Sequence, residues 1–205
     1  MRRALVAAMA LVAAALGLAL APPANATASD TAPIVIVGAP GLAWSDLERD
    51  DLPALTALVE QGASGLLSAR AVRSRSCAID GWLTLSAGRR AGDLPGPCRE
   101  PLPPVDGLVP NWADYVAAAA ADSYDARPGL LAEEVAASGA CVQSIGPGAA
   151  IGGADPGGAV GPTSSDTLPT SVACPVVLVD AGALPTTWPE RADAVARLDA
   201  LVAQV

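Results

Sequence analysis

Two short runs of apolar residues, at positions 34–37 and 175–179, constrain the fold of this chain most strongly. Both runs are unbroken, and both are rich in the β-branched residues Val and Ile. A strand with one face in water alternates apolar with polar side chains, whereas a continuous apolar run suits a strand that is covered on both faces. The two runs therefore predict a parallel sheet.

Strands and helices are predicted to alternate along the rest of the chain. Further strands are expected at 65–72, where apolar and polar residues alternate, and at 141–145. Helical spacing and end signals predict helices at 52–61, 80–87, 112–121, 128–137 and 189–205. The stretch 146–170 is rich in Gly, Pro, Ser and Asp and is expected to be a long surface excursion. This alternation predicts an α/β fold, with functional sites in the loops beyond the carboxyl ends of the strands.

The N-terminal segment has the organisation of a secretory signal peptide. Two arginines precede an apolar run at 4–21, and small residues suit cleavage after Ala26 or Ala28. We therefore predict a signal peptide at 1–28, a domain at 29–205 and a secreted or otherwise extracytoplasmic protein. An uncleaved membrane anchor is the alternative, because the apolar run is just long enough to span a bilayer.

The C-terminal end of the sequence lies inside a predicted helix. This helix reaches Val205 without a capping glycine or a polar tail, so the domain is expected to be incomplete there. A membrane tether beyond Val205 is a second route to anchoring.

The four cysteines are interpreted as disulfides because the protein is expected to be exported. Cys77, Cys98, Cys141 and Cys174 contain no C-x-x-C pair, and the sequence has no His, which disfavours a structural zinc site. We predict the pairs Cys77–Cys98 and Cys141–Cys174, because each joins neighbours in the sequence and the second links two predicted strands. Unpaired buried thiols are the alternative.

The charge balance disfavours one class of partner. The 12 basic residues are all Arg and stand against 21 acidic residues, which gives a net charge of -9. Such a surface repels a phosphate backbone, so nucleic-acid binding is not expected, while other partners stay unknown.

Three segments, 34–46, 52–68 and 76–88, resemble the start of the alkaline phosphatase superfamily. They contain the strand and loop IVIVGAPGLAWSD and the helix motif TLSAG. The resemblance covers about residues 33–90 and is strongest to domains of this kind in secreted or membrane-bound bacterial proteins. It implies a three-layer α/β/α sandwich with a mostly parallel sheet.

The same resemblance implies a site chemistry that this chain carries only in part. Catalytic members of the superfamily hydrolyse esters at a two-metal site, with an Asp ligand after the first strand and a Ser or Thr nucleophile before a Thr-Leu-x-x-Gly helix. Ser76 falls near the nucleophile position, as a nucleophile or its relic, whereas Pro40 stands where the Asp ligand is expected. We expect no cofactor in this chain, and a zinc-like divalent metal only if residues beyond Val205 supply ligands.

Three residues are candidates for site chemistry, and the first two also have a structural alternative. Ser76 is a nucleophile or a loop serine that is hydrogen-bonded to the backbone. Asp80 is an acid or base, or a cap of the helix that contains Trp82. Asp180 is a candidate binding residue because it ends the strand at 175–179.

Two other patterns favour structural roles. The acidic residues Asp46, Glu48, Asp50 and Asp51 are expected to form a solvated turn in which Asp51 caps the next helix. The segment 146–152 resembles a loosened dinucleotide-binding loop, but Pro147 removes an amide that would bind phosphate and the glycines at 152–153 are expected to break a helix.

The sequence thus predicts an exported module that is related to metal-dependent phosphate or sulfate ester hydrolases but is not catalytically competent as given. The alternative is a non-catalytic binding or scaffold module of the cell envelope.

Overall fold

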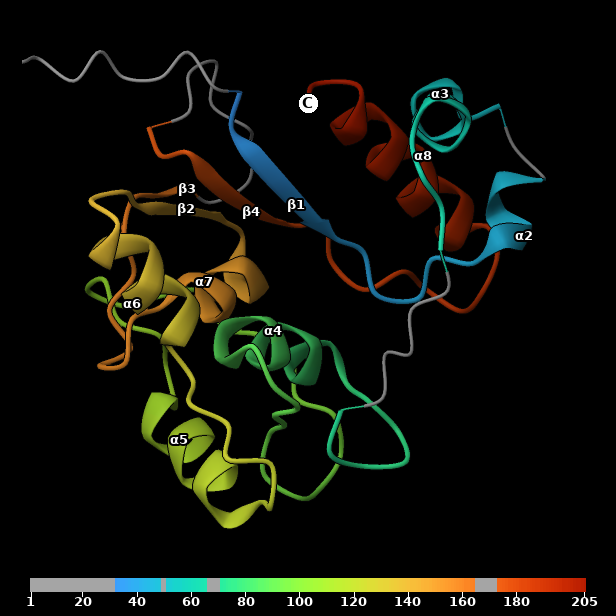
Figure 1. Ribbon diagram of the computed structural model, residues 1–205. Helices are drawn as coiled ribbons and strands as arrows, with labels where there is room; N and C mark the ends of the chain where they lie inside the picture. The colour runs from blue at the N-terminus through green and yellow to red at the C-terminus, as the bar shows by residue number, and fades with distance from the viewer. Residues whose placement is uncertain (1–31, 49–50, 66–70, 165–172) are drawn as a thin grey trace, which may run out of the picture. The chain divides into compact units, whose positions relative to one another are not determined.

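The computed structural model describes residues 32–48, 51–65, 71–164 and 173–205 (Figure 1). The predicted signal peptide at 1–28 and most of the predicted strand at 65–72 lie outside the described residues.

The described strands form one parallel sheet in the order β1-β4-β2-β3. Their bounds are Ile34–Gly38 for β1, Val142–Ile145 for β2, Thr163–Ser164 for β3 and Val176–Asp180 for β4. In this register Ile34 and Val142 both lie opposite Val176. The prediction of a parallel sheet built from the apolar runs is therefore confirmed, and the chain is an α/β protein.

Helices connect the strands and flank the sheet. They are α2 (Trp44–Leu47), α3 (Pro53–Gln61), α4 (Ala78–Ala87), α5 (Trp112–Ala121), α6 (Leu130–Ala137), α7 (Pro147–Gly153) and α8 (Glu190–Val202). All five helices expected from the sequence are present with ends shifted by up to three residues, whereas α2 and α7 were not expected.

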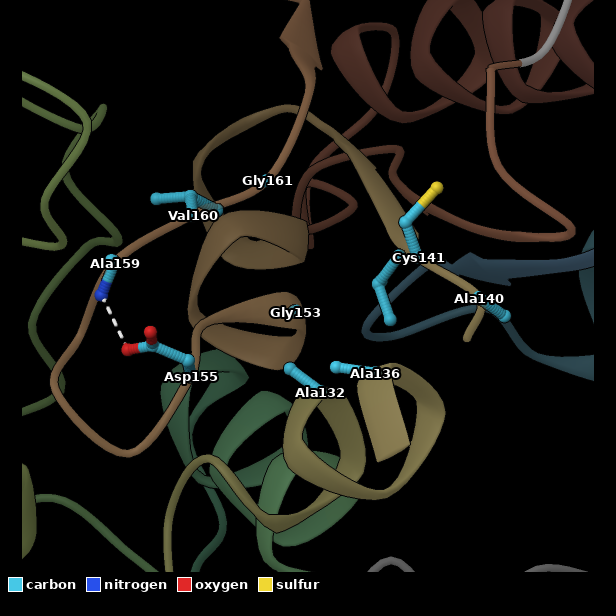
Figure 2. A pocket seen from close by; sticks show the side chains of 10 residues that line it. Ala132, Ala136, Ala140, Cys141, Gly153, Asp155, Ala159, Val160 and Gly161 are labelled. Atoms are coloured by element: carbon cyan, nitrogen blue, oxygen red, sulfur yellow. Dashed lines mark hydrogen bonds between the residues drawn. The ribbon is translucent and has the colours of Figure 1, made fainter. Parts of the chain in front are cut away.

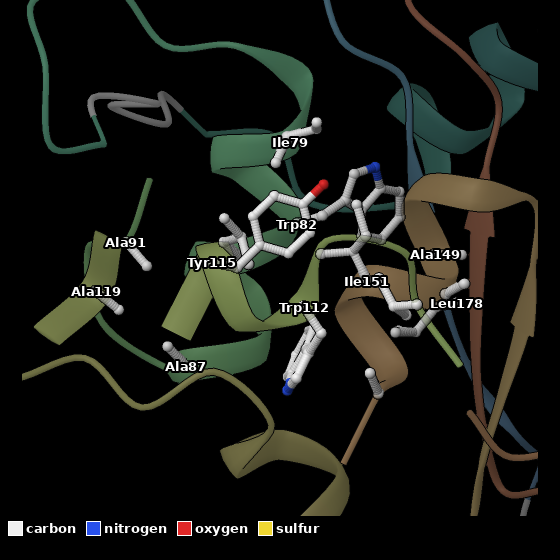
Figure 3. Packing of buried hydrophobic residues seen from close by; sticks show 14 of the residues in the cluster. Ile79, Trp82, Ala87, Ala91, Trp112, Tyr115, Ala119, Ala149, Ile151 and Leu178 are labelled. Atoms are coloured by element: carbon white, nitrogen blue, oxygen red, sulfur yellow. The ribbon is translucent and has the colours of Figure 1, made fainter. Parts of the chain in front are cut away.

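One face of the sheet is covered by α7, and α4 packs on α7 and reaches the sheet through Trp82. Figure 3 shows the indole of Trp82 beside Ile151 and Leu178, with Ile79 and Tyr115 close by. Ile79, Leu178 and Ile151 are completely buried, and Trp82 is 4% exposed. Burial of such side chains stabilises the fold by roughly 1.5–3 kcal/mol each, so this cluster is the main core of the protein.

The opposite face of the sheet packs against α8. Val177 and Val179 of β4 point to this side and are completely buried, with Leu201 of α8 packed against them. Since side chains alternate along a strand, Leu178 points to the α7 side instead. Both faces of β4 are therefore covered by apolar side chains, which explains why its sequence is apolar throughout.

Helix α3 packs on α8 and is capped by it. Asp51 was expected to cap this helix, but the N-cap is Leu52, which forms no side-chain cap, so that prediction is wrong. The backbone amide of Leu55 in the first turn instead donates a 2.8 Å hydrogen bond to Asp199 of α8. The amide at the start of α3 is therefore capped by a carboxylate that is 144 residues away in the sequence, and not by a neighbouring side chain.

The expected surface excursion at 146–170 is a second correction. Residues 147–153 form helix α7, and almost all of this helix is buried between α4 and the sheet. The glycines are tolerated because they allow close contact: a Cβ on Gly148 would lie 2.2 Å from Nε1 of Trp82, and one on Gly152 would lie 2.9 Å from Cε3 of the same ring. Packing has overridden the low helix propensity of glycine.

Candidate functional site

A cavity of about 600 Å³ lies at the carboxyl end of β1, between the loop that follows this strand and the first turns of α4. This is the edge of a parallel sheet where loops gather and where α/β proteins place their sites. Its walls are mainly apolar, and the described residues that line it are Ile36, Val37, Gly38, Ala39, Pro40, Gly41, Leu42, Ser76, Cys77, Ala78, Gly81, Trp82 and Leu85.

Ser76 is the one sequence-predicted candidate for site chemistry among these lining residues. It is exposed in the turn just before α4, and its Oγ accepts a 2.9 Å hydrogen bond from the backbone amide of Ala71. The hydroxyl proton is not used in this bond, so the group can still donate to a ligand in the cavity. The backbone contact matches the structural alternative, while the nucleophile role stays a prediction.

Asp80 supports the turn that carries Ser76. It is 1% exposed, and its Oδ2 and Oδ1 accept 2.8 Å hydrogen bonds from the amides of Cys77 and Asp93. An acidic side chain at the third position of α4 satisfies a free amide at the helix start. With both oxygens engaged by backbone donors, this carboxylate orients the turn and the following loop.

Two arginines hold residues 91–99, here called the Cys98 loop, in place: Arg73 from the segment before α4 and Arg99 from within the loop. Arg73 donates to the carbonyl oxygens of Asp93 and Leu94, the second at 2.8 Å. Arg99 forms an ion pair with Asp93 and lies 5.5 Å from the ring centre of Tyr115. The hydrogen bond with Asp93 raises the pKa of Arg99, and burial raises the pKa of Tyr115.

Asp180 holds the start of α7. It ends β4, and its Oδ2 accepts a 2.7 Å hydrogen bond from the amide of Gly148, while Oδ1 accepts one of 3.0 Å from Gly182. Two backbone donors thus account for both oxygens of the candidate binding residue. Asp180 connects the carboxyl end of β4 to the neighbouring helix.

A buried ion pair that sequence reasoning missed fixes the loops after β1 and β4. Arg191 of α8 donates to both oxygens of Asp46, at 2.7 and 2.6 Å, and to the carbonyls of Gly41 and Pro185, each at 2.7 Å. The hydrogen bond with Asp46 raises the pKa of Arg191. Asp46 is 1% exposed, so it does not belong to the solvated acidic turn that was expected.

A smaller cavity of about 280 Å³ lies beside β2 and α6 (Figure 2). Small side chains of Ala132, Ala136 and Ala159 line it together with Asp155. Oδ1 of Asp155 accepts hydrogen bonds from the amides of Gly157 and Ala159, at 2.8 and 2.9 Å. The carboxylate therefore stabilises its own turn.

Both predicted disulfides are present. Cys77 is bonded to Cys98 and Cys141 to Cys174, so the four cysteines are all paired as expected from the sequence. The second bond joins the segments that enter β2 and β4, which pair in the sheet. Two disulfides are typical of an oxidising, extracytoplasmic compartment.

Comparison with known proteins adds no relative. No protein-family model, curated protein or solved structure matches this chain.

Within the described parts of the chain, acidic, His and Cys side chains form no group of three that is suited to hold a metal ion. In the same parts, none of the helices is both long and apolar enough to cross a membrane.

The chemistry available in the β1 cavity is that of one hydroxyl in an apolar setting. Among the described lining residues, the only titratable side chain is Cys77, and it is held in a disulfide. Pro40 lines the cavity where a metal-binding Asp was considered, and it offers no side-chain ligand. These walls suit an apolar ligand, and the residues present do not fit a two-metal centre.

Proposed function

We propose that this chain is an exported module of the alkaline phosphatase superfamily that does not hydrolyse esters by itself. In this proposal it has the three-layer α/β/α arrangement of that superfamily, with α4 and α7 on one side of the sheet and α8 on the other. The arrangement around the cavity supports this relationship. The cavity lies between strand β1 and helix α4, with Ser76 just before α4, and these elements come from the segments 34–46 and 76–88 that resemble the superfamily.

The proposal that the module does not hydrolyse esters rests on one observation. Ser76 lines a cavity whose other described lining residues provide no ionised group. A serine hydroxyl attacks an ester only when a base or a metal ion removes its proton. The nearby Asp80 has both oxygens bonded to backbone amides, and the sequence contains neither His nor Lys. The described residues form no group of three that is suited to hold a metal ion, so a divalent metal would need ligands from outside them.

Hydrolysis assays test this proposal directly. The purified protein is offered a chromogenic phosphate monoester, a phosphate diester and a sulfate ester, each with added zinc, magnesium or calcium. We expect no turnover above that of buffer. Metal-dependent turnover that is lost in Ser76→Ala but kept in the neighbouring variant Ser74→Ala would show that Ser76 is an active nucleophile.

The apolar walls favour a second candidate, a non-catalytic binding module of the cell envelope. Trp82, Leu85 and Leu42 offer contact area to an apolar ligand, and Ser76 offers a hydrogen bond. An environment-sensitive apolar dye is expected to bind the native protein. Gly81→Leu should abolish dye binding, because Gly81 lines the cavity and a Cβ there meets no atom within 4 Å. Equal dye binding by this variant would argue against the cavity as the binding site.

A further inference from the structure

The two disulfides differ in their exposure to solvent. Cys98 is exposed, and Cys77 is half-buried in the wall of the β1 cavity. In the other pair Cys174 is 3% exposed and Cys141 is half-buried. Thiol–disulfide exchange requires that a thiolate reach a sulfur atom, so Cys98 is the most open point of attack among the four cysteines.

We propose that Cys77–Cys98 is an exchange site for low-molecular-weight thiols, and that Cys98 is the residue that becomes S-thiolated. The incoming thiolate attacks Sγ of Cys98 and forms a new S–S bond there. The Cys77–Cys98 bond breaks, and its electron pair leaves on Sγ of Cys77, which takes a proton from water. Attack of the Cys77 thiolate on the mixed disulfide reverses the step and expels the small thiol.

The position of Cys77 makes it a suitable leaving group. Cys77 is the N-cap of α4, a helix of 10 residues, and the positive end of a helix dipole stabilises a thiolate. Asp80 in the first turn of α4 opposes this effect, but its Oδ1 lies 4.0 Å from the guanidinium of Arg73. The wall of the β1 cavity would then carry a free thiol at Cys77, next to Ser76.

Non-covalent contacts keep Cys98 near Cys77 after the bond opens. Arg73 binds carbonyl groups of the Cys98 loop, and Asp80 accepts a hydrogen bond from the amide of Asp93 in the same loop. Neither Cys77 nor Cys98 takes part in these contacts. The loop therefore holds the two sulfur atoms at a high effective concentration, which makes the exchange reversible. This inference does not rest on the proposed relationship to ester hydrolases.

Exposure of the oxidised protein to reduced glutathione tests the proposal. The reaction is quenched with acid, free thiols are alkylated with N-ethylmaleimide, and peptides are mapped by mass spectrometry. We expect glutathione on Cys98 and maleimide on Cys77, with this bond opening at least about tenfold faster than Cys141–Cys174. Glutathione on Cys77, or equal opening of the two disulfides, would overturn the proposal.

Two variants separate exchange in the folded protein from general unfolding, with circular dichroism as the check of folding. In Cys77→Ser, Cys98 is expected to take one glutathione from glutathione disulfide and to keep it, because the resolving thiol is gone. In Arg73→Ala, the Cys98 adduct should accumulate several-fold more than in the unmodified sequence, because closure is slower. A Cys98 that stays unmodified in folded Cys77→Ser would refute exchange at this residue, and an unchanged adduct level in Arg73→Ala would refute the role of the loop contacts.

Discussion

At the scale of single residues, the three glycines of α7, which lack a side chain, decide how closely this helix approaches its neighbours. A Cβ on Gly153 would lie 2.4 Å from Oγ of Ser144, and one on Gly148 would lie 2.5 Å from Oδ2 of Asp180. Glycine in a helix costs about 1 kcal/mol relative to alanine. The short contacts show that alanine would cost more here, because the indole of Trp82 and the end of β4 already occupy the space.

The substitution Gly148→Ala is therefore expected to destabilise the protein. Because the added methyl group overlaps Trp82 and Asp180, the free energy of unfolding should fall by about 1–3 kcal/mol, as is typical of overpacked cores. Urea denaturation measures this change.

Gly81→Ala is the matched control for this prediction. Gly81 lies inside α4, where a Cβ meets no atom within 4 Å, so alanine should be neutral or stabilise the protein by up to about 1 kcal/mol. Equal effects of the two substitutions would show that close packing is not what selects glycine in α7.

At the scale of secondary-structure elements, the start of α3 depends on α8. Leu52 and Pro53 begin this helix without a side-chain acceptor, and Asp199 supplies one to the amide of Leu55. Asp199 is 9% exposed and lies at the contact between the two helices. One hydrogen bond thus both caps α3 and fixes it against α8.

The substitution Asp199→Ala is expected to remove that cap. It leaves the amide of Leu55 without its acceptor, which should lower the free energy of unfolding by about 1–2 kcal/mol. Thermal or urea denaturation measures the loss. Asp199→Asn keeps a carbonyl acceptor and should retain most of the stability. If both variants lose the same amount, the negative charge stabilises α3 and the hydrogen bond does not.

Sequence patterns predict elements well where the cause of an element is local. The strands β1 and β4 were expected because each is an unbroken run of apolar residues, which indicates a strand that is buried on both faces. Helix α7 was missed because its partners, Trp82 and Asp180, are remote in the sequence. The same reason hides the ion pair of Asp46 with Arg191 and the cap from Asp199. In the candidate site, Ser76 and its nearness to the first strand could be expected, but the connection of Asp80 to the Cys98 loop could not.

At the scale of the whole molecule, the two disulfides fit the oxidising, extracytoplasmic compartment to which the predicted signal peptide would direct the chain. Cys77–Cys98 closes a loop with a sequence separation of 21, and Cys141–Cys174 closes one of 33. Cross-links of this size stabilise a fold by about 3–4 kcal/mol each, because they restrict the unfolded chain. A domain with only 3% aromatic residues depends on such cross-links more than one with a larger aromatic core.

Export should therefore produce a shortened and fully oxidised chain. We expect the protein recovered from the extracytoplasmic space to begin after Ala26 or Ala28 and to contain no thiol that reacts with maleimide before reduction. Intact-mass measurement and N-terminal peptide mapping test both points. The same domain, made in a reducing cytosol without residues 1–28, should carry four free thiols, counted with maleimide after denaturation, and melt at a lower temperature. Oxidation of that material should restore the melting temperature, because the pairs Cys77–Cys98 and Cys141–Cys174 are already adjacent in the folded protein. An exported chain with four free thiols would contradict this account of its stability, and an intact N-terminus would indicate an uncleaved anchor instead of a signal peptide.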